Sequence, residues 1–247
     1  MKDRIKSRII DFMIIGVLLW AVLSIPDYAE TVKQAWQISD KAVVVIDPGH
    51  GGMDGGAEGI DGTSEKDINL RIASKLKEML EKEGVRVLMT RQTDEGLYKD
   101  NEDLSIRSLK TQDMYERKRI IDEACADLTV SIHLNSFTQD ASVKGAQVFY
   151  PAEGDKNVVE ESRLAAEIIQ SELNRNINTD KKRTELGKSD VLLLQTPDSP
   201  VVIVECGFLS NSEDLNDLKN SKHQEKISKS LKSSICKYLI KNGNNNQ

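Results

Sequence analysis

The sequence predicts an α/β domain in which helices are layered on both faces of one sheet. Apolar, β-rich runs alternate along the chain with segments of helical period, which is typical of strands and helices arranged around one sheet. The runs are continuously apolar, as expected of strands covered on both faces. The length of 247 residues suits one such domain with a short appendage, and the sequence has no internal repeat.

Six runs are predicted to be strands: residues 42–47 (AVVVID), 85–90 (VRVLMT), 127–134 (DLTVSIHL), 145–150 (GAQVFY), 191–195 (VLLLQ) and 201–206 (VVIVEC). Apolar residues at helical spacing predict helices over residues 64–83, 112–126, 158–174 and 223–240. The first helix has a capping-box pattern in Ser64 and Asp67, and Gly84 follows it as a C-cap.

The N-terminal 26 residues differ from the rest of the chain. Four basic residues precede an apolar run of fourteen residues, 12–25, which resembles an export signal peptide. A membrane span needs roughly 20 residues, and an uncleaved anchor stays open as the alternative. Residues 27–40 are interpreted as a polar linker, residues 41–241 as the main domain and residues 242–247 as a disordered tail. With the basic residues held in the cytoplasm, the main domain is expected to be extracytoplasmic, secreted or membrane-anchored.

Composition excludes some classes of function. A net charge of −6 argues against nucleic-acid binding, and aromatic residues are only 4% of the chain, which disfavours base stacking. The three cysteines, Cys125, Cys206 and Cys236, are too widely spaced for a disulfide framework or a cysteine metal site. They are interpreted as small buried residues.

Two of the three histidines stand at the ends of predicted strands. His50 follows the run 42–47, His133 belongs to the end of 127–134, and Glu205 belongs to the end of 201–206. The carboxyl ends of strands in an open α/β sheet meet at one edge, where ligands bind. Histidines that meet at such an edge suggest a metal. His223 lies at a charged helix start and is interpreted as a solvated residue without a role in the site.

A hydrolytic zinc site takes three nitrogen or oxygen ligands and leaves a fourth position for water. Glu65, which begins the first predicted helix, is the candidate carboxylate, although a carboxylate there is also favourable at a helix N-terminus without any metal. Glu205 is a candidate general base beside such a metal; the alternative is an ion pair with a lysine or arginine.

Seven of the fifteen glycines lie between Gly49 and Gly62, in the loop that joins His50 to Glu65. The loop lacks the Gly-Lys-Ser/Thr ending of a phosphate loop and the Gly-x-Gly-x-x-Gly pattern of dinucleotide sites. The chain also lacks the Gly-x-Ser-x-Gly elbow of serine hydrolases. We expect these small residues to let the backbone turn tightly and to keep bulk away from the fourth metal position.

Four segments, taken together, resemble a known family: VVVIDPGHGGMDGGAEG, SEKDINL, ADLTVSIHLNS and PVVIVECGFLSN. They are similar to the motifs of the zinc-dependent N-acetylmuramoyl-L-alanine amidases, the amidase_3 family of bacterial cell-wall hydrolases. The resemblance spans roughly residues 43–239. It implies that His50, Glu65 and His133 bind Zn²⁺ and that Glu205 is the catalytic residue.

The resemblance also implies a fold and a reaction. The fold is a mixed, mainly parallel sheet flanked by helices, similar to zinc exopeptidases, and the catalytic domain is residues 41–241. The reaction is hydrolysis of the amide between the lactyl group of muramic acid and the L-alanine of the stem peptide. Two alternatives stay open from sequence: a catalytically weak or inactive homologue that binds peptidoglycan or a partner, and a zinc peptidase on the same fold.

Within the family, the chain resembles the germination-specific, CwlD-like amidases of spore formers, which act on spore cortex and prepare it for muramic-δ-lactam formation. The segment 94–115 is longer than the usual link, and the segment between His133 and Glu205 lacks a long insertion that could plug the site. Some relatives need a partner protein for activity, so an activating partner is a hypothesis here. The basic stretch 181–188 (KKRTELGK) faces either the anionic stem peptide or solvent.

Overall fold

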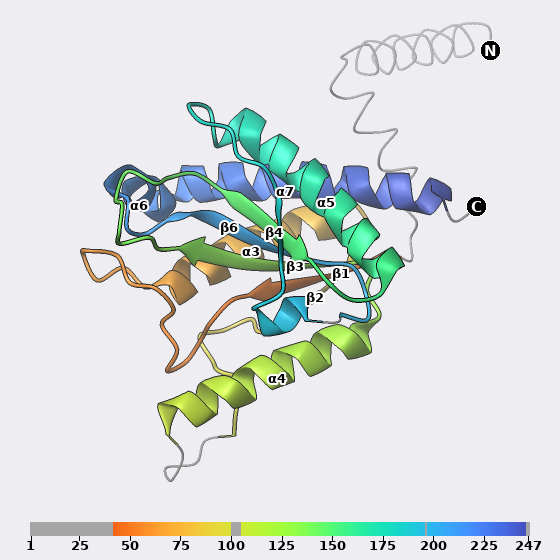
Figure 1. The fold of residues 1–247 in the computed structure, drawn as a ribbon, viewed down its shortest axis with the longest axis horizontal. Coiled ribbons are helices and arrows are strands. Elements are labelled where there is room, and N and C mark those ends of the chain that lie inside the picture. Colours follow the sequence, from red (N-terminus) through yellow and green to blue (C-terminus); the bar gives the residue numbers. More distant parts are fainter. Residues whose placement is uncertain (1–41, 100–104, 196, 246–247) are drawn as a thin grey trace, which may run out of the picture.

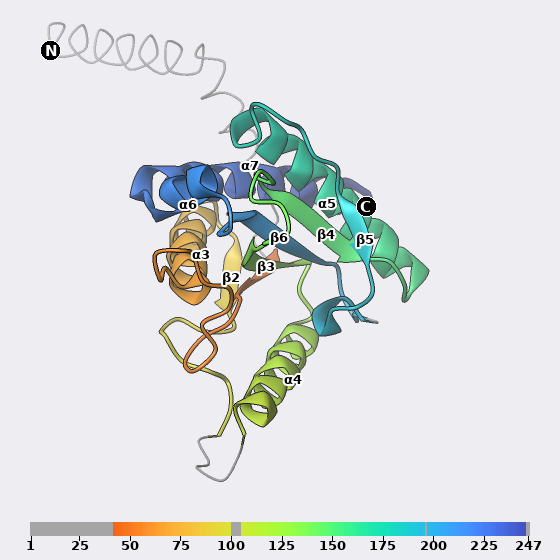
Figure 2. The same ribbon diagram turned by 60° about the vertical axis from the view of Figure 1, so that its left-hand side comes forward.

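In the computed structural model, the described residues are 42–99, 105–195 and 197–245. They contain a six-stranded sheet of order β2-β1-β3-β6-β4-β5 (Figures 1 and 2). The strands are β1 (Val43–Pro48), β2 (Arg86–Met89), β3 (Leu128–Asn135), β4 (Gln147–Pro151), β5 (Leu186–Lys188) and β6 (Val201–Phe208). β2, β1, β3 and β6 are parallel, whereas β4 is antiparallel to β6, and β5 is parallel to β4. The mixed, mainly parallel sheet predicted from the family resemblance is confirmed.

Helices cover both faces of this sheet. One face carries α3 (Glu65–Lys82), α5 (Lys156–Asn176) and α7 (Ser221–Asn245), with the short α6 (Ser212–Lys219) packed beside α7. The opposite face carries α4 (Ile106–Ala124) and a single 3₁₀ turn, η1 (Leu192–Leu194). Figure 1 shows α4 on one side of the sheet and α3, α5 and α7 on the other. The predicted two-sided covering is therefore confirmed.

The two faces are packed by different means. On the α3, α5 and α7 side, alternate strand residues such as Val44, Ile132 and Val204 join a large core cluster with the apolar residues of the three helices. On the α4 side the apolar clusters are small, and one is formed by Val45, Ile121, Ala126 and Leu193. Strands alternate their side chains, so the residues beyond Val45 on that face are available for polar groups.

The run 191–195 is not a strand, so that prediction is wrong. Leu193 and Leu194 are buried in a 3₁₀ turn, in which the Leu194 amide donates to the Val191 carbonyl at 2.9 Å. A short apolar run can be buried by a tight turn as well as by a strand, and periodicity alone does not distinguish them. The sixth strand is instead β5, which lies inside the basic stretch 181–188.

Two helix ends and one helix cap depart from the predictions in ways that the local contacts explain. α4 begins at Ile106 rather than near 112, because the Ser105 hydroxyl caps it by accepting from the Ser108 amide. Ser64 is the N-cap residue of α3 but makes no capping bond; its hydroxyl donates to the Gly55 carbonyl at 2.8 Å. α7 continues to Asn245, into the segment for which composition predicts a disordered tail.

The predicted signal or anchor (1–26) and linker (27–40) lie outside the described residues. Within the described ranges, none of the helices combines the length and the apolar character that crossing a bilayer requires.

The cysteines are not all buried. Cys206 and Cys236 are buried as expected, but Cys125 is exposed. It occupies the C-cap of α4 with a left-handed φ of 44°, a conformation that costs a non-glycine residue roughly 1 kcal/mol or more. The helix has to end there because β3 begins three residues later.

We therefore expect Cys125→Gly to raise the free energy of unfolding by about 1 kcal/mol relative to Cys125→Ala, because glycine adopts this φ without strain. The β-branched Cys125→Val should lower it. Urea denaturation of the three variants measures the differences. Equal stability of the glycine and alanine variants would contradict the strain at this position.

Candidate metal centre

The structure brings His50, Glu65 and His133 together at the carboxyl ends of the parallel strands. Their ligand-type atoms all lie within 4.8 Å of one another. His50 Nε2 is 3.3 Å from Glu65 Oε2, and His133 Nδ1 is 2.9 Å from Glu65 Oε1. The two imidazole rings are edge to face, with centroids 4.9 Å apart. Three side chains from a loop, a helix start and a strand end thus converge on one point.

Glu65 is the fixed member of this cluster, with only 2% of its surface exposed. Its carboxylate accepts from the Ala57 amide at 2.8 Å and from the Leu134 amide at 2.9 Å. Burial alone would raise the pKa of Glu65, but hydrogen bonds from His133 and His50 outweigh it and hold the pKa well below its usual range. The carboxylate is therefore ionised and held in one orientation between the two imidazoles.

The ring of His50 is oriented by a contact at Nδ1, the nitrogen that does not face Glu65. Nδ1 is 2.8 Å from Asp54 Oδ2, and the second oxygen of Asp54 pairs with Lys110 Nζ at 2.6 Å. Burial alone would lower the pKa of His50, but the carboxylates of Asp54 and Glu65 raise it to about 9. A carboxylate on the remote ring nitrogen is the usual support of a metal-binding histidine, because it fixes ring orientation and tautomer.

Two positions of the loop require glycine because neighbouring side chains lie too close to leave room for a Cβ atom. A Cβ on Gly49 would lie 2.2 Å from the His133 ring, and one on Gly56 would lie 2.5 Å from Glu65 Oε2. Gly56 also has a left-handed φ of 74°. At these positions the expectation that small residues are needed is met, but the reason is contact with the ring of His133 and the carboxylate of Glu65.

Two buried arginines hold the backbone that carries His50. Arg117 Nη1 contacts Asp47 Oδ1 at 2.6 Å and donates to the Pro48 carbonyl at 2.8 Å, while Nη2 donates to the His50 carbonyl at 2.5 Å. Arg91 donates to the Pro48 and Gly49 carbonyls at 2.9 and 3.0 Å. These carbonyls belong to the segment that leaves the sheet, so the arginines fix its path.

Neither arginine was predicted from the sequence to lie beneath the site. Asp47, which pairs with Arg117, is fully buried. Burial would raise its pKa, but the charge of Arg117 and the hydroxyls of Ser131 and Thr90 lower it to about 2. A charged residue inside a run as apolar as 42–47 was the available signal, because a buried carboxylate requires a buried partner.

Glu205 lies on β6 opposite His133 in the strand register. Its Oε2 is buried and has no hydrogen-bond partner among the described residues. Burial is the main cause that raises the pKa of Glu205 above its usual range. Among the described residues, no lysine or arginine makes an ion pair with Glu205, so the ion-pair alternative is not observed there. An unpartnered buried carboxylate oxygen on the strand next to His133 is suited to proton transfer.

The cluster fits a metal ion bound by nitrogen and oxygen. Ligand atoms about 2.0–2.1 Å from one tetrahedral ion lie roughly 3.3 Å apart. One ligand-type atom from each of the three residues lies within 4.8 Å of the others, and the two histidines contact separate oxygens of Glu65 at 3.3 and 2.9 Å. Two imidazoles and one carboxylate leave one position of the tetrahedron for substrate or water. His50, Glu65 and His133 therefore form a possible metal site with the composition expected of a hydrolytic one.

His223 does not join this cluster. It is half-buried beside Asp217, with 3.8 Å between Nδ1 and Oδ2, so the expectation of a fully solvated side chain is wrong because α6 covers it.

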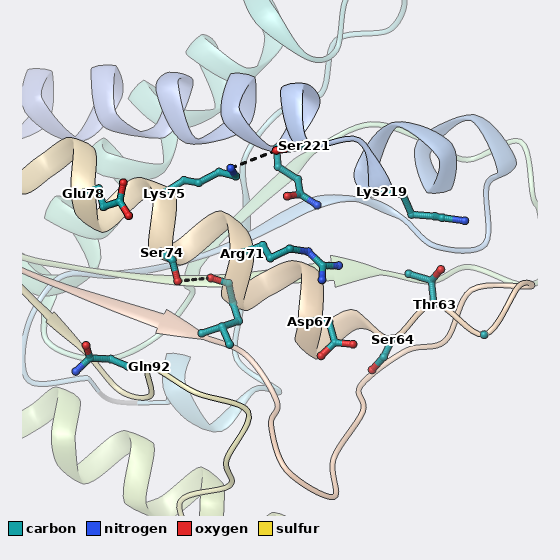
Figure 3. A pocket seen from close by; sticks show the side chains of 13 residues that line it. Thr63, Ser64, Asp67, Arg71, Ser74, Lys75, Glu78, Gln92, Lys219 and Ser221 are labelled. Atoms are coloured by element: carbon teal, nitrogen blue, oxygen red, sulfur yellow. Dashed lines mark hydrogen bonds between the residues drawn. The ribbon is translucent and has the colours of Figure 1, made fainter.

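A surface cavity of about 870 Å³ lies along the outer face of α3 and the start of α7 (Figure 3). It is lined by polar side chains such as Arg71, Lys75 and Ser221 and by none of the four predicted site residues.

Comparison with known proteins places this fold and site in a family. The family model described as N-acetylmuramoyl-L-alanine amidase, Amidase_3, matches residues 44–237. The germination-specific N-acetylmuramoyl-L-alanine amidase of Bacillus subtilis is 34% identical over 202 residues, which cover 81% of each chain. The chain therefore belongs to the Amidase_3 family of N-acetylmuramoyl-L-alanine amidases, and within it to the branch of CwlD.

Solved structures agree with this placement. The CwlD amidase of Clostridioides difficile, determined in complex with the GerS lipoprotein, superposes with a TM-score of 0.76 at 40% identity, covering 81% of this chain and 98% of that one. The amidase AmiC2 of Nostoc punctiforme gives 0.65 at 30% identity, covering 82% and 98%. The predicted enzyme class and branch are confirmed.

A stability measurement tests the buried pair beneath the site. Asp47→Asn should lower the free energy of unfolding by about 3 kcal/mol at pH 7, because it leaves a buried guanidinium short of a counter-charge. The pKa of Asp47 is lowered on folding, so its charge stabilises fully above about pH 4, and this contribution, about 2 kcal/mol, is lost as the pH falls to about 2.

The difference between wild type and Asp47→Asn in urea denaturation should accordingly shrink between pH 4 and pH 2. Glu153→Gln, which removes an exposed carboxylate, is the matched control and should change stability little at any pH. A difference for Asp47→Asn that does not depend on pH would contradict the buried ion pair.

Proposed function

We propose that the protein hydrolyses the amide between the muramic acid lactyl group and L-alanine of peptidoglycan with a zinc ion held by His50, Glu65 and His133. The observation that carries this proposal is the convergence of these three side chains beside the unpartnered buried carboxylate of Glu205. When bound, zinc supplies a Lewis acid that polarises an amide carbonyl and acidifies water.

The role we assign to Glu205 is that of general base and then general acid. It accepts a proton from the attacking water and delivers it to the alanine nitrogen as the amide bond breaks, so no acyl-enzyme forms. Its buried position suits both steps, because burial raises its pKa and lets it hold a proton at a higher pH than an exposed glutamate. Asp54 keeps the His50 ring in place through Nδ1 throughout.

The biological setting we propose is the spore cortex during germination. A germination-specific amidase is among the relatives, and the CwlD amidase is among the solved structures. Removal of stem peptides there would prepare muramic acid for conversion to muramic-δ-lactam. This role places the enzyme outside the cytoplasm, as a secreted or membrane-anchored protein.

We further propose a protein partner. The CwlD amidase of Clostridioides difficile was determined in complex with a lipoprotein, GerS, and this chain is similar to that amidase over 81% of its length. A related lipoprotein is the expected kind of partner. Full zinc occupancy and full activity of the purified chain alone would argue against a need for it.

Digestion of purified muropeptides and cortex, followed by mass spectrometry, tests the reaction. Intact stem peptides with a new N-terminal L-alanine are the expected products. Release of single amino acids from within the stem would instead indicate a peptidase and would overturn the proposal.

The four site residues are expected to separate into two classes of variant. Glu205→Gln should retain bound zinc and lose at least about a hundredfold in kcat, because it removes the proton carrier. His133→Ala should lose zinc, because two ligands are too few for tight binding. Zinc content by mass spectrometry and amidase rates are the measurements. His223→Ala, which replaces a histidine remote from the cluster, is the control and should keep both.

Near-normal turnover by Glu205→Gln would refute the role given to Glu205. Retention of stoichiometric zinc by His133→Ala would refute the ligand set.

A further inference from the structure

The basic stretch 181–188 does not act as one surface. Arg183 turns inward: it donates to the Gln147 side chain at 2.9 Å and its guanidinium lies 5.0 Å from the centroid of the Phe208 ring. Lys188, the last residue of β5, instead extends over Phe149, with Nζ 5.1 Å from the ring centroid. Figure 2 shows β5 at the edge of the sheet, beyond β4. Only some of these cations can therefore meet a substrate.

The strand register connects Lys188 to Glu205. On β4, Gln147 is opposite Glu205, and Phe149 lies two residues further along. β5 adds Leu186 opposite Phe149 and Lys188 two residues on. Alternate residues share a face, so these side chains lie on the α4 side of the sheet with Glu205. We call Phe149, Leu186 and Lys188 the β5 surface.

The β5 surface is accessible and partly apolar. Leu186 is 48% exposed, Phe149 is half-buried, and the Lys188 side chain is 38% exposed. The surface thus presents an apolar patch that ends in a cation, on the same face of the sheet as the carboxylate of Glu205.

Lys188 is only loosely paired. Its partner, Asp190, is 3.7 Å away and its side chain is 75% exposed, an arrangement of little energetic value. Lys110 and Lys66, in contrast, are held by Asp54 and Asp94 at 2.6 and 2.7 Å. The positive charge of Lys188 also reaches Glu205, where it opposes the larger effect of burial on the pKa.

We propose that Lys188 binds a carboxylate of the stem peptide, with the apolar side chains of the β5 surface supporting the peptide beside it. The proposal rests on the amidase function proposed above. The muramic acid side of the scissile bond is uncharged, because its lactyl carboxyl is consumed in the amide, whereas the stem peptide is anionic. Lys188, whose only carboxylate contact among the described residues is a long one, therefore identifies the β4 side of Glu205 as the one for the peptide.

The lengths agree with recognition at the second stem residue. Each extended residue spans about 3.5 Å, so a carboxylate on that residue lies roughly 7 Å from the scissile nitrogen. Lys188 is level with Pro151, four residues along β4 from Gln147, but its Nζ lies over the ring of Phe149. Phe149 is two residues from Gln147, which is about 7 Å along the strand. Lys188 would then select peptides whose second residue is D-glutamate with a free α-carboxylate over those with the corresponding carboxamide, D-isoglutamine.

The test compares two muropeptides that differ only in this carboxylate or carboxamide. Wild-type protein should prefer the free acid about tenfold in kcat/KM, mainly through KM, as one charge-assisted hydrogen bond allows. Lys188→Gln should remove the preference, and Lys188→Arg should keep it. Lys182→Gln, an exposed cation of the same stretch, is the matched control and should behave as wild type.

Two outcomes would overturn the proposal. One is an unchanged preference in Lys188→Gln. The other is an equal fall of kcat on both substrates with the preference retained, which would show that Lys188 acts through Glu205.

Binding of the two isolated stem peptides, followed by NMR titration, separates this proposal from the proposed function. In one outcome, wild-type protein binds the free-acid peptide selectively, Lys188→Gln loses this selectivity, and wild type cleaves neither muropeptide. This outcome would refute the amidase reaction and support the role of Lys188. Cleavage of both muropeptides with no preference in either assay would support the amidase reaction and refute the role of Lys188.

Discussion

The ion pair between Arg117 and Asp47 is the interaction on which the metal cluster depends. Both side chains are at most 1% exposed, and removing two charges from water costs several kcal/mol for each ion. The cost is offset because every direction of the guanidinium is used: Asp113 supplies a second carboxylate, and the carbonyls of Pro48 and His50 accept the remaining donors. The same bonds that satisfy the buried charge thereby fix the backbone on which His50 stands.

This arrangement explains why α4 matters although its apolar contacts with the sheet are few. α4 supplies Arg117 to the carbonyl of His50 and Lys110 to Asp54, which in turn contacts the His50 ring. His50 adopts a left-handed φ of 63°, a conformation that surrounding bonds have to enforce in a non-glycine residue. The large core under α3, α5 and α7 gives the sheet its stability, and the polar contacts of α4 give the site its geometry.

Much of the site followed from where residues stand in the sequence. His50, His133 and Glu205 come at the ends of strand-like runs, and parallel strands bring such ends to one edge, so their convergence was predictable; the pairing of Glu65 with both histidines needed the family resemblance. The strand β5 and the start of α4 were missed, because the first is three residues long and the second depends on one serine cap. Arg117 was missed because a cation on a polar helix is normally solvated, and only its tertiary partner Asp47 shows otherwise.

The antiparallel direction of β4 gives the site its asymmetry. If β4 were parallel to β6, its C-terminal end would lie at the site. Because β4 is antiparallel, its first residue, Gln147, is level with Glu205 and the strand runs away from the site. The described part of the segment between His133 and Glu205 contains β4, α5, β5 and η1 together with the loops that join them. Beside Glu205 the sheet therefore continues outward as a surface of strand side chains. A substrate can lie along such a surface in an extended form, and selectivity then depends on single side chains that reach back toward the reacting bond.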